Sequence, residues 1–156
     1  MKAEHINPFI ISTSEVFKTM VGAEPRKEEV YVRDEKEFVN EISGVIGLAG
    51  DANGFVIISM PESLALKIYK SFAGEEKDAI DPDVTDAIGE ILNMIAGGAK
   101  QIFSRLGVRF KISIPNVILG KDHKIAKQRT TKSLCVKFSL EGSSFVIEAA
   151  LQEKKG

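Results

Sequence analysis

The sequence is poor in the residues that usually build metal centres and disulfides. It has one cysteine, two histidines and no tryptophan. A single thiol forms no intrachain disulfide, so Cys135, which lies in a strand-like run, is predicted to be a small buried side chain. His5 and His123 have no histidine or cysteine partner at ligand spacing, which argues against a zinc site. No phosphate-binding loop, dinucleotide fingerprint or nucleophile motif is recognisable. We therefore expect neither a metal centre nor a self-contained covalent one.

The chain also lacks a surplus of either charge and any long apolar run. Its 21 Lys and Arg residues nearly balance 22 Asp and Glu residues, which argues against the basic surface of a nucleic-acid-binding protein. No stretch is long enough to span a membrane, and the amino terminus has no signal-peptide pattern. We expect a cytoplasmic protein that binds neither nucleic acid nor membrane, with all 156 residues (1–156) in one domain.

The clearest pattern that is present lies between Asp81 and Gly107 and predicts a long amphipathic helix. Asp81 suits the N-cap, Pro82 suits the first helical position, and Gly107 is a natural stop. The apolar residues between them recur at the helical period and define a stripe that faces a core. They are Ile88, Ile91, Leu92, Ile95, Ala99, Ile102, Phe103 and Leu106.

The opposite stripe of this helix is polar or small. It consists of Asp86, Glu90, Asn93, Gly97 and Gln101. Three glycines, at positions 89, 97 and 98, interrupt the helix, and each costs about 1 kcal/mol relative to alanine. Glycine on an exposed face lets another surface approach the backbone. We interpret the stripe as a docking surface with a carboxylate and a carboxamide at its centre. A merely solvated face is the alternative, because most polar stripes are solvated faces.

The rest of the chain predicts an α+β fold: a mostly antiparallel sheet built from hairpins, with two long helices and one shorter helix packed on it. The two halves repeat the same plan of a helix followed by hairpins. The other expected elements are a helix over 5–21 capped at Asn7, a short edge strand at 30–32, a hairpin over 43–60, a helix over 62–73, strands over 108–114 and 116–120 broken at Pro115, and a hairpin over 133–151.

Asp86-x-x-x-Glu90-x-x-Asn93, followed by Gly97 and later by Pro115, resembles the signature of the CheC/CheX family of chemotaxis phosphatases. The length and the order of elements resemble that family over the whole chain, most closely its CheX-like members. The resemblance implies a CheC-like/CheX-like fold with pseudo-duplicated halves. It also implies a phosphatase that acts on the phospho-aspartate of a CheY-like response regulator receiver domain, and a homodimer, because CheX-like members carry one motif per chain.

The resemblance also implies roles for single residues. Asn93 would position the attacking water, because an amide donates and accepts hydrogen bonds at once. Glu90 would pair with a lysine of the receiver. Asp86 would support Glu90 or extend the docking surface, and Gly97 and Gly98 would let the partner approach closely. The chain would need no metal or cofactor of its own, because the receiver domain would supply Mg²⁺.

Two other functions fit the same stripe. One is a non-catalytic receiver-binding module that sequesters or senses a response regulator, and the other is a dimeric scaffold or small-ligand sensor. Glu4 and Asn7 repeat the Glu-x-x-Asn spacing, but helix capping also explains Asn7, so no second site is assigned. The basic stretch Lys121–Lys132 could attract an acidic receiver, although a solvated loop is the favoured interpretation. The sequence names neither the receiver nor the pathway.

Overall fold

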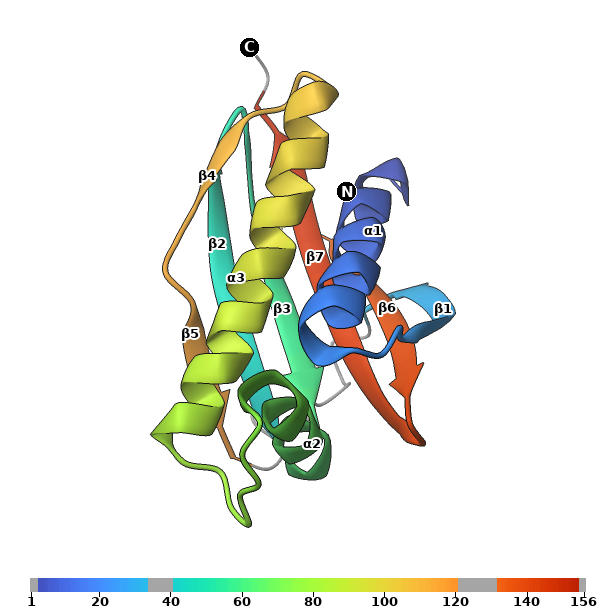
Figure 1. Ribbon diagram of the computed structural model, residues 1–156. Coiled ribbons are helices and arrows are strands. Elements are labelled where there is room, and N and C mark those ends of the chain that lie inside the picture. The colour runs from blue at the N-terminus through green and yellow to red at the C-terminus, as the bar shows by residue number, and fades with distance from the viewer. Residues whose placement is uncertain (1–2, 34–40, 121–131, 155–156) are drawn as a thin grey trace.

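Seven strands form one antiparallel sheet, and helices cover one of its faces (Figure 1), in the part of the chain that the computed structural model describes, residues 3–33, 41–120 and 132–154. The helical elements are η1 (Ala3–Ile6), α1 (Asn7–Val16), η2 (Phe17–Val21), α2 (Glu62–Ala73) and α3 (Pro82–Arg105). The strands are β1 (Arg26–Val32), β2 (Ile42–Gly50), β3 (Ala52–Met60), β4 (Phe110–Ile112), β5 (Asn116–Leu119), β6 (Leu134–Leu140) and β7 (Ser143–Glu153). The predicted α+β architecture is confirmed.

The strand order shows that the two halves of the chain share one plan. The order is β1-β6-β7-β3-β2-β4, and β5 also pairs with β2. Strands β3 and β7 pair at the centre, from Ala52 opposite Glu153 to Ser59 opposite Val146. Each of these two strands is flanked by its own hairpin partner, β2 beside β3 and β6 beside β7, and then by an outer strand from the other half of the chain. The elements α1, β1 and β2–β3 therefore correspond to α3, β4–β5 and β6–β7, as the predicted pseudo-duplication requires.

The ends of α3 follow the sequence signals. The Asp81 carboxylate accepts a hydrogen bond from the Val84 backbone N–H at 3.0 Å, which satisfies one of the free donors at the start of a helix. Gly107 follows the helix with a φ of 86°, a value that glycine adopts without strain. Leu106 was expected in the core, but it is 68% exposed. It lies past the end of α3 at Arg105, so the helical period no longer places it.

The start of α1 differs from the prediction. Asn7 was expected to cap this helix, but the preceding residue Ile6 already has helical backbone angles and no side chain caps the helix. The reason is that η1 runs directly into α1, so Asn7 lies inside a continuous helical segment and does not occupy an N-cap position. The helical segment otherwise ends as predicted, at Gly22, which has a φ of 81°.

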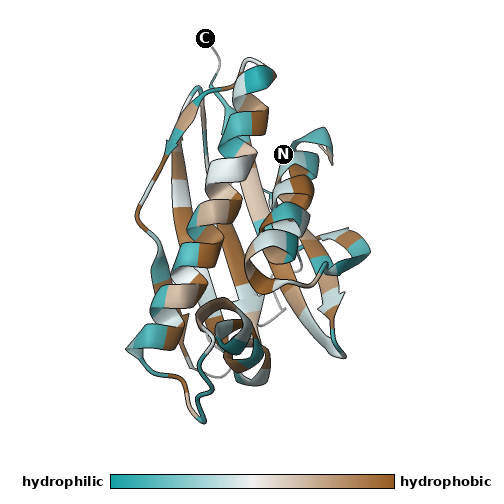
Figure 2. Ribbon diagram, viewed as in Figure 1, coloured by the Kyte–Doolittle hydropathy of each residue, from teal (hydrophilic) through white to brown (hydrophobic). Residues whose placement is uncertain are grey.

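The main core lies between the sheet and the helices. The apolar stripe of α3 is fully buried at Ile88, Ile91 and Ile95, and hydrophobic residues line the strands beneath the helices (Figure 2). The ring of Phe103 on α3 packs against that of Phe9 on α1, with ring centroids 5.6 Å apart. The burial of these apolar side chains anchors α3 on the sheet. The opposite stripe of the helix must therefore face outward.

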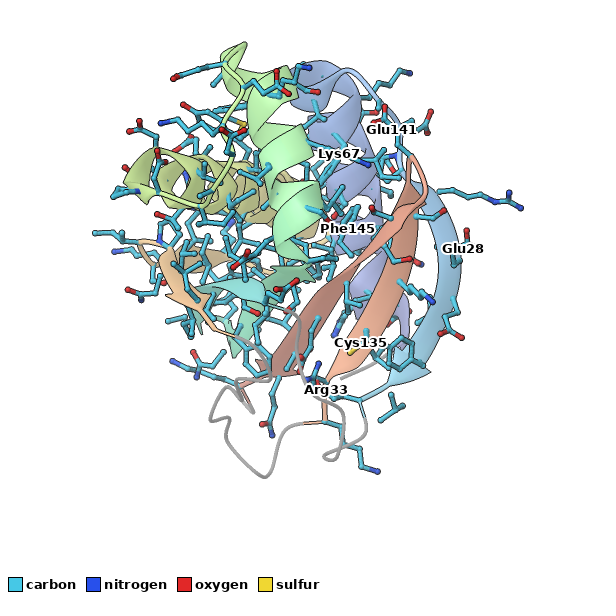
Figure 3. The ribbon with its side chains drawn as sticks, turned by 90° about the horizontal axis from the view of Figure 1, so that it is seen from below. Glu28, Arg33, Lys67, Cys135, Glu141 and Phe145 are labelled. Carbon is cyan, nitrogen blue, oxygen red and sulfur yellow. The ribbon has the colours of Figure 1, made fainter. Side chains whose placement is uncertain are left out.

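A buried ion pair lies near the carboxyl end of β1. Arg33 and the 1% exposed side chain of Glu148 are 2.9 Å apart, and the Ser133 hydroxyl donates to the other oxygen of Glu148 at 2.6 Å. Burying a carboxylate is costly unless it is paired in this way. Cys135 is paired with Glu148 across β6 and β7, near Arg33 (Figure 3), and is buried as predicted.

In the described part of the chain, no helix has both the length and the apolar character needed to cross a membrane. His123 and most of the basic stretch Lys121–Lys132, up to residue 131, lie outside the described residues.

Candidate functional site

Helix α3 presents its polar stripe to solvent, as the sequence predicts. Asp86, Glu90 and Gln101 are exposed, and Asn93 and Gly97 are half-buried. These positions advance by three or four residues, so they follow one side of the helix. Asp83 is also exposed and continues the stripe by one turn toward the amino end of α3.

The three glycines of α3 have different surroundings. A Cβ at Gly97 would meet no atom within 4 Å, whereas a Cβ at Gly89 would lie 3.4 Å from Pro115 Cγ. A Cβ at Gly98 would collide with the Ser12 hydroxyl of α1. The prediction that Gly98 lies on the docking surface is therefore wrong, because the packing of α1 explains this glycine. Gly97 remains on the open face.

The contact at Gly98 fixes α1 against α3. The Ser12 hydroxyl donates a hydrogen bond to the Ile95 carbonyl at 2.6 Å, in a buried position. This bond forms because the missing side chain at Gly98 lets the backbones of the two helices come close. The rotation of α3 about its own axis, and hence the direction of its polar stripe, is set partly by this contact.

Glu90 and Asn93 lie one helical turn apart on this stripe. Among the described residues, no hydrogen bond or ion pair occupies either side chain. Asn93 lies one turn after Gly89, so it is on the flank of α3 that faces Pro115. This position explains why Asn93 is half-buried while Glu90 is exposed. Both side chains are available to bind a group brought by another molecule.

The amino end of the stripe is held by a cluster around Lys77. The Lys77 ammonium donates to the carboxylate of Asp81 and, at 2.9 Å, to that of Asp83. These two hydrogen bonds raise the pKa of Lys77. The hydrogen bond from Lys77, together with that from the Val84 N–H, lowers the pKa of Asp81. The ammonium also lies 5.5 Å from the ring centroid of Tyr69, which ties α2 to the start of α3.

This cluster changes the charge along the stripe. Because Lys77 pairs with Asp83, the negative charge of that residue is locally compensated. Asp86 and Glu90 have no such partner among the described residues. Two adjacent carboxylates are therefore available to attract a cationic group.

The chemistry of the stripe follows from its two central side chains. The carboxamide of Asn93 can hold a water molecule by accepting one hydrogen bond and donating another. The carboxylate of Glu90 can pair with a lysine or arginine. No group of three or more His, Cys, Asp or Glu side chains able to hold a metal occurs within the ranges that the structure describes.

The amino-terminal Glu-x-x-Asn has a different backbone from the motif of α3. Glu4 and Asn7 are both exposed, but Glu4 lies in η1 and Asn7 is the first residue of α1. Glu90 and Asn93 instead share one continuous α-helix. The same spacing along the chain therefore does not place the two pairs in the same geometry.

Sequence reasoning missed four features of this region. Lys77 and Ser12 carried no local signal, because their partners are known only once α2, α1 and α3 are packed. Pro115 was noted in the motif, but its contact with Gly89 joins segments that are distant in the sequence. Asp83 could have been placed on the stripe by extending the helical period one turn.

Comparison with known proteins shows which family shares this sequence. Residues 42–139 match the family model described as Chemotaxis phosphatase CheX. The CheY-P phosphatase CheX of Thermotoga maritima is 32% identical over 126 residues, which are 80% of this chain and 81% of the relative.

Several solved structures of CheC-like and CheX proteins have the same fold as this chain. A CheC-like superfamily protein from Shewanella sp. PV-4 has a TM-score of 0.90 and 33% identity, over 97% of this chain and 99% of that one. The chemotaxis protein CheX from Vibrio vulnificus has a TM-score of 0.89 and 33% identity, over 96% and 100% of the chains. A CheX–CheY–BeF3–Mg²⁺ complex from Borrelia burgdorferi matches with a TM-score of 0.83 and 28% identity, over 97% and 100%.

A single antiparallel sheet with helices on one face and an acid–amide stripe on the central helix places the protein in the CheC-like class. Within that class, the chain belongs to the CheX family of chemotaxis phosphatases.

Proposed function

We propose that this chain hydrolyses the phospho-aspartate of a CheY-like receiver domain. The membership of the CheX family supports the proposal, as does the relative that is named a CheY-P phosphatase. A similar chain also occurs in a CheX–CheY complex. The observation that carries the proposal is the pair Glu90 and Asn93, held one turn apart on α3 with no internal partner among the described residues.

In the proposed reaction, water attacks the phosphorus atom and the bond between phosphorus and the aspartate oxygen breaks. The products are the free aspartate carboxylate and inorganic phosphate, which takes up the proton of the water. Phosphoryl transfer of this kind depends mainly on positioning and electrostatic stabilisation. Asn93 positions the water in line with the breaking bond. Mg²⁺ belongs to the receiver and is not a cofactor of this chain.

The remaining residues of the stripe dock the receiver. Glu90 pairs with a lysine beside the phospho-aspartate, and Asp86 extends the negative surface by one turn. Gly97 leaves the backbone open, so the partner can approach without meeting a side chain. In this proposal the chain supplies two functional groups and the receiver supplies the rest of the active site.

We further propose that the protein forms a homodimer. Strand β1 ends one edge of the sheet and exposes Val30 and Val32, and an edge strand can pair with a second copy. Sedimentation should then give a dimer at micromolar concentration, and a monomer under the same conditions would contradict the proposal.

The experiment that tests the catalytic proposal is the release of radiolabelled phosphate from a panel of phosphorylated receiver domains. The wild-type chain should accelerate release from at least one of them. Binding without acceleration across the panel would assign the chain instead to the non-catalytic receiver-binding modules.

A further inference from the structure

Ile114 is the most exposed of the large hydrophobic side chains in the described part of the chain, at 84%. It lies between β4 and β5 at one edge of the sheet. Single exposed apolar residues are common on protein surfaces, so this exposure alone decides nothing. Two other observations bear on its role: Ile114 lies in a β-bulge, and this bulge lies beside α3.

A one-residue bulge presents Ile114. Ile112 pairs with Leu48 and Asn116 pairs with Val45, so the three residues Ser113–Pro115 lie opposite only the two residues Ile46 and Gly47. Bulges of this kind redirect a side chain and are frequent beside active sites. The extra residue breaks the regular alternation of the edge strand, and Ile114 is left facing solvent.

The bulge is anchored by Ser113. Its backbone N–H donates to the Gly47 carbonyl at 2.9 Å, and its hydroxyl accepts from the Gly47 N–H at 2.8 Å. The same hydroxyl lies 3.2 Å from the Ile114 carbonyl, to which it donates. These bonds fix the backbone of the bulge, and a segment whose backbone is already ordered loses less conformational entropy when it binds a partner.

The bulge lies beside the site helix. The Pro115 ring packs on Gly89, where an added Cβ would lie 3.4 Å from Cγ, and the β4–β5 segment runs along one flank of α3 (Figure 1). Gly89 directly precedes Glu90 and lies one turn before Asn93. A molecule that brings a group to Asn93 from this flank therefore also meets the bulge.

We propose that Ile114 is a docking residue for the same receiver domain, and that it inserts into an apolar depression on the rim of that domain's phosphorylation site. The proposal rests on the proposed function. The receiver is the favoured occupant because the bulge lies against the same flank of α3 that carries Asn93. The apolar contact would add shape complementarity to an interface in which Glu90 supplies a charged contact.

This role affects affinity more than chemistry. The contact is the same before and during phosphoryl transfer, and such uniform binding changes KM and leaves kcat in place. Ile114→Ser should raise the Kd for the beryllofluoride-loaded receiver about tenfold, about 1.4 kcal/mol at 25 °C. The kcat of phosphate release should stay within about twofold of wild type.

Leu106→Ser is the matched control, because Leu106 is 68% exposed just past the carboxyl end of α3 and outside the bulge. It should change neither quantity, and Ile114→Val should keep most of the affinity. An unchanged Kd for Ile114→Ser, or an equal loss for Leu106→Ser, would overturn the proposal. Loss of a wild-type dimer in Ile114→Ser, seen by sedimentation, would assign the residue to a second copy of the chain and also overturn it.

The two proposals fail in different ways. If wild type releases phosphate and Ile114→Ser binds and turns over normally, the docking residue is wrong and the phosphatase stands. If wild type releases no phosphate but Ile114→Ser weakens receiver binding, the phosphatase is wrong and the docking residue stands. If wild type binds no receiver at all, both are wrong.

Discussion

Glu90 and Asn93 are adjacent on α3 but have different tasks in the proposed reaction. The carboxylate provides charge for docking, and the amide provides hydrogen bonds for a water molecule. Because neither side chain has an internal partner among the described residues, truncation removes an interaction with the receiver and leaves no broken internal bond behind. Changes at these positions should therefore affect function without lowering stability.

The charge of Glu90 should matter for binding. Glu90→Gln keeps the shape of the side chain and removes the ion pair with the receiver lysine, so we expect a Kd about tenfold higher at low salt. The difference from wild type should shrink as salt is added, because ions screen the wild-type pair. Fluorescence titration of the receiver at two salt concentrations measures both effects.

Glu4→Gln is the matched control for this substitution, because Glu4 begins the amino-terminal Glu-x-x-Asn and is also exposed. It should bind the receiver as wild type does. A comparable loss of affinity would show that the amino-terminal pair is a second docking site.

At the scale of elements, the packing of α1 on α3 gives opposite expectations for two neighbouring glycines. Gly97→Ala adds a methyl group in open space and should stabilise the protein by up to about 1 kcal/mol through helix propensity. Gly98→Ala pushes against Ser12 and should destabilise it by about 1–3 kcal/mol. Equilibrium denaturation of both variants measures the difference.

A double-mutant cycle tests whether contact with Ser12 causes the destabilisation in Gly98→Ala. Ser12→Ala removes the hydroxyl that the new methyl group would meet, so it should recover part of the loss in Gly98→Ala. Additive effects of the two substitutions, or equal effects at Gly97 and Gly98, would contradict the packing described for α1 and α3.

The Lys77 cluster should make stability depend on pH. The hydrogen bond from Lys77 lowers the pKa of Asp81 below its ordinary value of 3.8. Its contribution is therefore fully present above that value and is lost as the pH falls through the lower pKa of the folded protein. Lys77→Met should lower Tm at pH 7, and the gap to wild type should close in acid.

Thermal unfolding of both proteins between neutral pH and about pH 2 covers this transition. The raised pKa of Lys77 keeps its ammonium charged throughout this range, so the loss in acid comes from protonation of its carboxylate partners. A Tm difference that stays constant down to the lowest pH would show that the cluster acts by packing and not by charge.

Local signals predicted most of the elements. The cap at Asp81, the stop at Gly107 and the break at Pro115 depend on neighbouring residues, and the structure confirms each of them. Asn7 and Gly98 were misread because their surroundings come from outside the local sequence. The short helix η1 precedes Asn7, and α1 packs on Gly98.

At the scale of the molecule, the two halves share a plan but not a site. Pairing of β3 with β7 at the centre of the sheet relates α1 to α3, yet only α3 carries its Glu-x-x-Asn on a continuous α-helix. The hairpin pattern was enough to predict the plan of each half. The pairing of β1 with β6 and the bulge at Ser113–Pro115 were not predictable, because they join strands far apart in the sequence.

The most direct test of the proposed activity compares wild type with Asn93→Ala in the release of radiolabelled phosphate from a receiver that the wild type binds. Removing the group that positions the water should slow release by about 10²–10³-fold, while the Kd for the beryllofluoride-loaded receiver stays within about threefold. Release by Asn93→Ala at the wild-type rate would contradict the catalytic role of Asn93.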